Sequence, residues 1–209
     1  GLSAGLLTGC VPQYPDPALS PNPPEEQSVP SLNQLQFENI LSGITNATSE
    51  ADETANRELL DTRLAGPSLV FRTSYYTLLN RSDEITPPKP ISDRLQLALP
   101  TKTESWPRVA MMVVGDGTAE SPLQALFIRQ ESVRENYRLW YNIELLPNIE
   151  FPEVPALEAG SVPIGQDSGF LNFRVSGLVP AIGNLIDYGL DSISVNLIDP
   201  NNQYIAQAS

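Results

Sequence analysis

Proline is concentrated in two stretches of this 209-residue chain, and these stretches limit where regular structure can form. Seven of the 20 prolines lie within residues 11–30, and prolines and glycines return between Pro147 and Gly169. Proline lacks a backbone N–H and interrupts helices and central strands. The first stretch predicts an extended tether with a reach of about 60 Å, or a strap along a partner. The second predicts a linker or a strap across the sheet.

The residues between these stretches have the pattern of a helix followed by a sheet. Ser31 to Gln34 fits a capping box, and apolar residues then recur at helical spacing, which predicts one amphipathic helix over residues 32–60. Residues 68–79 fit a strand or a helix. Strands are predicted over residues 95–99, 108–114, 123–130 and 137–146, with a hairpin turn at Gly115-Asp116-Gly117. In the last of these, alternation places Leu139, Tyr141, Ile143 and Leu145 on one face.

These elements predict an α+β fold, with the long N-terminal helix packed on a curved antiparallel sheet. Cystatin-like and nuclear-transport-factor-like architectures meet this description by analogy. A further helix is expected within residues 178–190. The predicted organisation is the end of a signal peptide in residues 1–10, the tether in residues 11–30 and the α+β domain in residues 31–150. Residues 151–170 form the linker or strap, and residues 171–209 a partial second domain or C-terminal extension.

The only cysteine, Cys10, ends the sequence Leu7-Thr8-Gly9-Cys10 after a short apolar stretch. This is the pattern of a bacterial lipobox, in which the thiol receives a diacylglyceryl group before the signal peptide is cleaved. The apolar stretch is shorter than the roughly 20 residues of a transmembrane helix. Cys10 is therefore predicted to be lipidated and to anchor the protein on the extracytoplasmic face of the cytoplasmic membrane. The alternative is a free thiol on a buried apolar segment.

Charge and composition exclude several functions. The chain has 25 acidic and 12 basic residues, a net charge of −13, and no histidine. Nucleic-acid binding depends on basic residues, so the charge argues against it. The lack of histidine removes Ser-His-Asp and Cys-His catalysis and the usual imidazole metal ligands. The carboxylate pairs lie where solvated charge is expected. We therefore expect no enzymatic activity, no metal and no cofactor.

Arginines and aromatic residues gather on the predicted strands, against the acidic trend of the chain. The arginines are Arg108, Arg129, Arg134 and Arg138. One interpretation pairs them with Glu104, Glu131 and Glu135 at the surface. The other makes this region a contact for a partner protein, because Arg, Trp and Tyr dominate binding hot spots. The predicted contact residues are Trp106, Arg108, Tyr137, Arg138 and Trp140.

Three sequence segments carry a resemblance to a known family. They are Thr62 to Pro67, Trp106-Pro107-Arg108, and Tyr137-Arg138-Leu139-Trp140 followed by Leu145-Leu146-Pro147. The chain resembles a family of secreted actinobacterial lipoproteins of unknown function, in which a lipobox and a proline-rich tether precede a helix and a sheet. The resemblance implies an acyl anchor in an actinobacterial cell envelope. It transfers no catalytic residue.

Two functional hypotheses follow. The first is a non-catalytic accessory or assembly subunit of a cell-envelope membrane complex, for example the respiratory supercomplex. The alternative is a lipoprotein that binds a lipid or a cell-wall precursor in a cavity. That cavity is expected between the sheet and the helix face of Phe37, Ile40 and Ile44.

Overall fold

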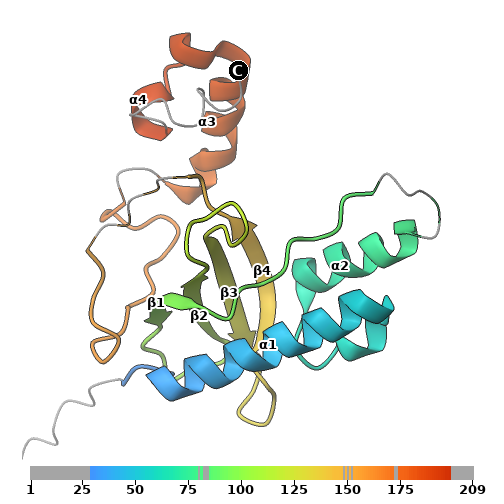
Figure 1. Ribbon diagram of the computed structural model, residues 1–209. Helices are drawn as coiled ribbons and strands as arrows, with labels where there is room; N and C mark the ends of the chain where they lie inside the picture. Colours follow the sequence, from blue (N-terminus) through green and yellow to red (C-terminus); the bar gives the residue numbers. More distant parts are fainter. Residues whose placement is uncertain are drawn as a thin grey trace, which may run out of the picture.

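The computed structural model describes residues 29–79, 81, 85–147, 149, 151, 153–171 and 174–198. Cys10, the tether up to residue 28 and the chain from residue 199 lie outside these residues, so the predictions made for them are not addressed. The elements appear in the order given next (Figure 1). They are α1 (Gln34–Thr54), η1 (Arg57–Leu59), α2 (Gly66–Leu79), β1 (Leu95–Pro100), β2 (Arg108–Val114), β3 (Gln124–Gln130), β4 (Arg138–Glu144), α3 (Val175–Tyr188), η2 (Gly189–Asp191) and α4 (Val195–Ile198).

Helix α1 begins behind a capping box that lies two residues later than predicted. The Asn33 side chain accepts a hydrogen bond from the Gln36 backbone at 3.0 Å, and the Gln36 side chain accepts one from the Asn33 backbone at 2.9 Å. The helix ends because Ala55 takes a left-handed conformation with φ of 49°. Asn56 then caps the short helix η1. The prediction of one helix through residue 60 is therefore wrong beyond residue 54.

The segment that the sequence left open between strand and helix is helix α2. Its buried residues are Ser68, Arg72 and Tyr76, which recur every four residues. Val70 and Phe71 are instead 64% and 68% exposed. The inner face of α2 is thus largely polar and its outer face partly apolar. Hydrophobic periodicity is the main sequence signal for a helix, and here that signal points away from the core.

The four strands form one antiparallel sheet in the order β1-β2-β3-β4. Met112 in the middle of β2 lies opposite Ala98 of β1 and Leu126 of β3, which fixes the register of three strands. The predicted strands match the observed ones except at their ends, where β4 is shorter than expected. The helices and this sheet confirm the α+β class. The cystatin-like and nuclear-transport-factor-like analogies stay predictions.

Strand β4 contains a bulge that reverses its faces. Phe127 of β3 lies opposite Tyr141, but the next residue, Ile128, lies opposite Leu139, so Trp140 is an extra residue. Leu139 is buried in the core, whereas Tyr141 and Ile143 are substantially exposed. The prediction that these residues share one face is wrong, because an alternating pattern cannot be continued across an inserted residue.

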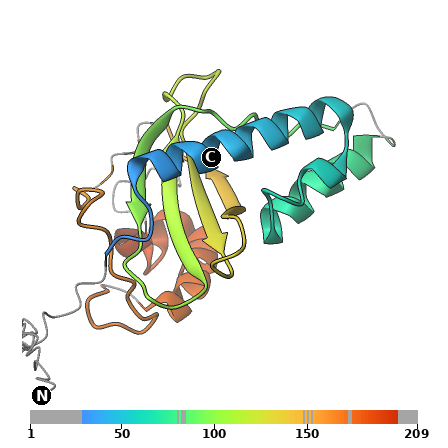
Figure 2. The same cartoon turned by 90° about the horizontal axis from the view of Figure 1, so that it is seen from below.

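Helix α1 and the sheet share one hydrophobic core. Phe37, Leu41 and Ile44 of α1 belong to the same buried cluster as Met112, Leu126 and Ile128. Figure 2 shows α1 running across the strands. Each fully buried side chain of this kind contributes about 1.5–3 kcal/mol of transfer free energy. The amphipathic pattern that predicted α1 is therefore also what fixes its buried face.

Short backbone pairings cover parts of both outer strands of the sheet. Next to β4, the Leu139 N–H donates to the Arg63 carbonyl at 2.7 Å, and the Ala65 N–H donates to the Leu139 carbonyl at 2.9 Å. At the end of β1, Pro100 accepts from Ser161 at 2.8 Å, and Thr101 accepts from Ser31 at 3.0 Å. Residues from the chain before α1 and from the segment after Pro147 thus meet beside β1.

The C-terminal helices pack with one another. Ala181 and Leu185 of α3 are buried, and the Ser192 hydroxyl donates to the Asn184 side chain at 2.7 Å. Neither apolar residue belongs to the core cluster of α1 and the sheet. Helix α3 begins three residues before the predicted helix and continues through Pro180. The apolar side chains Val179, Ile186 and Ile193 are largely exposed.

Candidate functional site

A cleft of about 360 Å³ lies where the start of α1 meets the first residues of β2 and the connection between β3 and β4. We name it the arginine cleft. Three of the five predicted contact residues line it. The lining residues that matter for its chemistry are Ser31, Arg63, Trp106, Arg108, Glu135 and Tyr137.

The fold brings these residues together from four separate parts of the sequence. Arg108 begins β2 and lies opposite Gln130, the last residue of β3. Tyr137 directly precedes β4. Arg63 is held beside β4 because its carbonyl accepts the Leu139 N–H. Ser31 is held by its backbone hydrogen bond to Thr101. Strand pairing therefore sets the cleft, and no single sequence motif contains it.

Arg108 is the most unusual group in the cleft. Its guanidinium carbon lies 4.4 Å from the centroid of the Trp106 ring, within the range of a cation–π interaction. Its Nε is buried without a hydrogen-bond partner. Within the described residues, no carboxylate forms an ion pair with Arg108. The positive charge of Arg108 is thus held by stacking and remains available to a negative group.

Two buried hydroxyls lie in the same region. Tyr137 is 7% exposed, and the hydroxyls of Tyr137 and Ser31 are buried without a well-formed hydrogen bond among the described residues. Burial raises the pKa of the Tyr137 hydroxyl, and the Ser31 hydroxyl and the Arg108 charge offset only part of this rise. Tyr137 is therefore a neutral donor at physiological pH. A buried group left unpaired costs about 1–3 kcal/mol, which a ligand would recover in part.

Arg63 brings a second guanidinium to the cleft, and a glycine makes room for it. A Cβ atom on Gly43 of α1 would lie 2.7 Å from the Arg63 guanidinium carbon. Only glycine therefore lets Arg63 lie this close to the helix. Glycine within a helical pattern often marks such a close approach. Gly43 is thus the one sequence signal for this part of the cleft.

The other predicted contact residues lie outside the cleft lining. Arg138 pairs with Glu135 at 3.0 Å. Trp140 lies under Arg129, whose guanidinium carbon is 4.8 Å from the ring centroid. Arg129 forms an ion pair with Glu131, with its Nε 2.9 Å from one carboxylate oxygen and its Nη2 donating to the other at 3.2 Å. The surface ion pairs considered for these arginines thus exist for Arg129 and Arg138.

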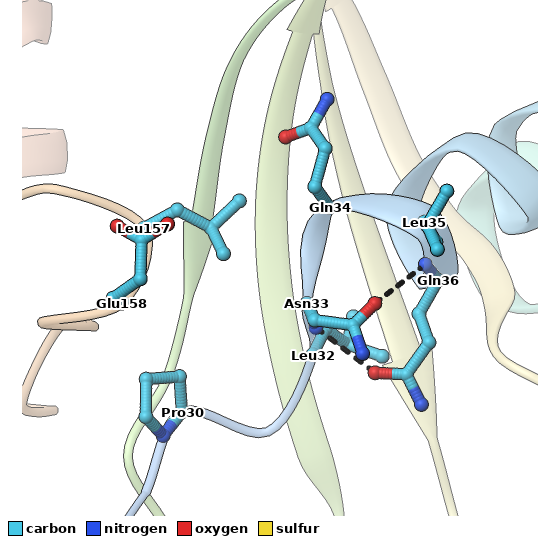
Figure 3. Close-up of a pocket in the computed structure, with 8 residues that line it drawn as sticks. All are labelled: Pro30, Leu32, Asn33, Gln34, Leu35, Gln36, Leu157 and Glu158. Atoms are coloured by element: carbon cyan, nitrogen blue, oxygen red, sulfur yellow. Dashed lines mark hydrogen bonds between the residues drawn. The ribbon is translucent and has the colours of Figure 1, made fainter.

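A second hollow, of about 510 Å³, lies between the start of α1 and the segment of Leu157 and Glu158 (Figure 3). Pro30 and Leu157 lie across it from the first residues of the helix. Of its polar lining residues, Asn33 and Gln36 bond to each other in the capping box, and the Gln34 side chain donates to Glu38 at 2.7 Å. This hollow therefore offers little chemistry for recognition.

Two of the three residues proposed for a lipid cavity, Phe37 and Ile44, are packed in the core. Phe37 and Ile44 have no exposed surface, and Ile40 lines the arginine cleft. Among the described residues, no group of three or more potential acidic or cysteine ligands is arranged for a metal ion. The described helices include none with the length and apolar character to cross a membrane.

A buried polar cluster away from the cleft joins α1, α2 and the loop before β1. Asp52 of α1 accepts hydrogen bonds from Arg72 and, at 2.6 Å, from the Tyr76 hydroxyl. Arg72 also donates to the Lys89 carbonyl at 3.4 Å. Every charged group in this cluster has a partner. We assign it a structural role.

The cluster predicts a loss of stability at alkaline pH. Burial, together with the Asp52 carboxylate, raises the pKa of the Tyr76 hydroxyl above its ordinary value of 10.0. The folded state thus retains the Tyr76 proton more tightly than the unfolded state. This contribution is complete below pH 10.0 and is lost as the pH rises further. At neutral pH we expect Tyr76→Phe to lower the free energy of unfolding by about 1–2 kcal/mol relative to the wild type. Above pH 10.0 the free energy of unfolding should fall less for Tyr76→Phe than for the wild type, as measured by urea unfolding.

The exposed Tyr188 supplies the control for this experiment. Tyr188→Phe should retain the wild-type dependence of unfolding free energy on pH. Equal alkaline slopes for the wild type and Tyr76→Phe would contradict the role of Tyr76.

Comparison with known proteins does not identify the chain. No family model, no curated protein and no solved structure matches it. The resemblance to actinobacterial lipoproteins therefore stays a prediction from the sequence. A functional proposal has to rest on the residues of the chain, and the arginine cleft is the strongest feature they offer.

Proposed function

We propose that this chain is a non-catalytic interaction protein, lipid-anchored at Cys10 on the extracytoplasmic face of the cytoplasmic membrane. It acts as an accessory or assembly subunit of an actinobacterial cell-envelope membrane complex and contacts its partner through the arginine cleft. The observation that supports this most is Arg108, which is stacked on Trp106 with its Nε buried and has no carboxylate partner among the described residues.

The composition of the cleft supports partner binding over catalysis. Arginine, tryptophan and tyrosine are the residue types enriched in interface hot spots. The cleft combines them with buried hydroxyls that lack a well-formed hydrogen bond within the part of the chain that the structure describes. The chain has no histidine to serve as a general base. A surface of this kind binds through shape and charge and needs no reactive group.

The proposal predicts a complex that depends on Arg108. The full-length protein should be purified from its own membranes in mild detergent, and its partners identified by mass spectrometry. We expect stoichiometric membrane subunits, with those of the respiratory supercomplex as the first to examine. Arg108→Gln should lower their recovery about tenfold, because charge-assisted contacts are strong. Cys10→Ala should release the protein from the membrane.

Two controls locate the contact. Arg94→Gln removes an equal charge from an exposed arginine that pairs with Asp116, and its partner recovery should match the wild type. A photo-crosslinking residue at Val133, which is exposed and lines the cleft, should capture the partner. The same residue at Val162, exposed elsewhere, should not. Recovery of the protein alone, or a complex indifferent to Arg108→Gln, would refute the proposal.

A further inference from the structure

We propose that the arginine cleft recognises a carboxylate side chain on an acidic segment of the partner protein, with Arg63 and Arg108 as the two guanidinium donors. This inference rests on the proposed function and specifies the chemistry of its contact. It adds Arg63, which is not among the predicted contact residues, and Gly43, which makes room for the Arg63 guanidinium.

The electrostatic surroundings favour an anion in the cleft. The chain carries twice as many acidic as basic residues, yet two of its arginines line this one cleft. No ion pair between either of them and a carboxylate is present among the described residues. A guanidinium presents its donors in a planar fork that matches a carboxylate. The buried Nε of Arg108 and the Tyr137 hydroxyl are further donors that lack a well-formed hydrogen bond among the described residues.

The remaining lining residues favour a carboxylate over a phosphate. Glu135 also lines the cleft, and its negative charge opposes a second charge on the ligand. Of the charged residues that line the cleft, Arg63 and Arg108 are positive and Glu135 is negative, so the lining carries a net charge of +1, which a single carboxylate balances. The exposed amides of Asn39 and Asn136 are also at the cleft. Amides of this kind hydrogen-bond peptide groups, which a protein segment carries beside its carboxylate.

Gly43 provides a way to move Arg63 without removing it. Alanine at position 43 would place a methyl group against the Arg63 guanidinium, whose flexible side chain would have to move aside. Alanine also favours the helical backbone over glycine. Gly43→Ala should therefore leave the protein folded while weakening carboxylate binding. A stability defect cannot account for that combination.

The experiment uses the two tryptophans of the chain as reporters. The full chain is labelled with fluorotryptophan, and its two fluorine resonances are assigned with Trp106→Phe. The probes are N-acetylglutamate N-methylamide, the matching glutamine compound and inorganic phosphate. We expect a saturable shift of the Trp106 fluorine resonance with the glutamate compound alone, while the resonance of Trp140, which lies outside the cleft lining, stays unchanged.

The variants test which residues bind the carboxylate. Arg63→Gln and Arg108→Gln should each weaken binding about tenfold. Gly43→Ala should also weaken it, and Arg94→Gln should have no effect.

Several results would overturn this inference. They are equal binding of the glutamine compound, tighter binding of phosphate, lack of a saturable Trp106 shift, or unaltered affinity in the arginine variants. The outcome is separate from that of the purification. Selective carboxylate binding without an Arg108-dependent complex would refute the proposed function alone. An Arg108-dependent complex without carboxylate selectivity would refute this inference alone.

Discussion

Asp52→Ala is expected to lower the free energy of unfolding by about 3 kcal/mol. The Arg72 side chain is 5% exposed, so removal of Asp52 leaves its charge buried without a carboxylate. The Tyr76 hydroxyl loses its acceptor in the same step. Little replaces these contacts, because among the described residues the only other hydrogen-bond partner of Arg72 is the Lys89 carbonyl at 3.4 Å. Urea unfolding followed by circular dichroism measures the loss.

Two further variants separate this explanation from a general weakening of α1. Glu53→Ala changes the adjacent exposed carboxylate and should stay within about 0.5 kcal/mol of the wild type. Asp52→Ala combined with Arg72→Met removes the unpaired charge and should recover part of the stability. If Asp52→Ala fails to fold, Asp52→Asn retains an acceptor for Tyr76 and can be measured. An Asp52→Ala protein as stable as the Glu53→Ala protein would contradict the assignment.

Gly66→Ala is expected to cost about 3 kcal/mol, for two reasons that add. Gly66 has a φ of +54°, in the left-handed region that side chains disfavour. An added Cβ would also lie 2.7 Å from two carbons of the Trp140 ring. That ring occupies the bulge of β4 and carries Arg129 above it. We expect a lower urea midpoint together with a shifted tryptophan emission.

Gly165→Ala is the matched control for this substitution. Gly165 has no atom within 4 Å of an added Cβ and no positive φ. Its unfolding free energy should remain within about 0.5 kcal/mol of the wild type. Equal stability of Gly66→Ala and Gly165→Ala would show that the Trp140 ring yields without cost and that the left-handed backbone is not required.

The sequence predicted the parts of the fold in which local pattern and burial agree. In α1 the apolar residues Phe37, Leu41 and Ile44 are the buried ones, and the strands follow their apolar runs. The sequence did not decide between strand and helix for α2. Its buried face is formed by Ser68, Arg72 and Tyr76, so the helix has no apolar stripe that marks its period. The faces of β4 were misassigned because a bulge is a property of the pairing between two strands.

The candidate site was predicted in part. Trp106, Arg108 and Tyr137 were chosen for their residue types, and all three line the arginine cleft. Arg138 and Trp140 have the same types but lie elsewhere, because pairing with Glu135 and the bulge of β4 position them. Arg63 and Ser31 come from distant segments and reach the cleft through backbone pairings. Residue type therefore suggests which residues could form a contact site, and the pairing of the strands decides which of them line the cleft.

The backbone pairings beside β1 and β4 also bear on how the protein behaves when many copies are crowded together. An unpaired strand edge is a template on which another chain adds, and natural sheets commonly protect it. Here residues 63–65 pair with β4, and Ser161 and Ser31 pair with the chain at the end of β1. These pairings reduce the free edge at which copies could add to one another and aggregate. A protein concentrated on a membrane surface by an acyl chain would benefit from this protection.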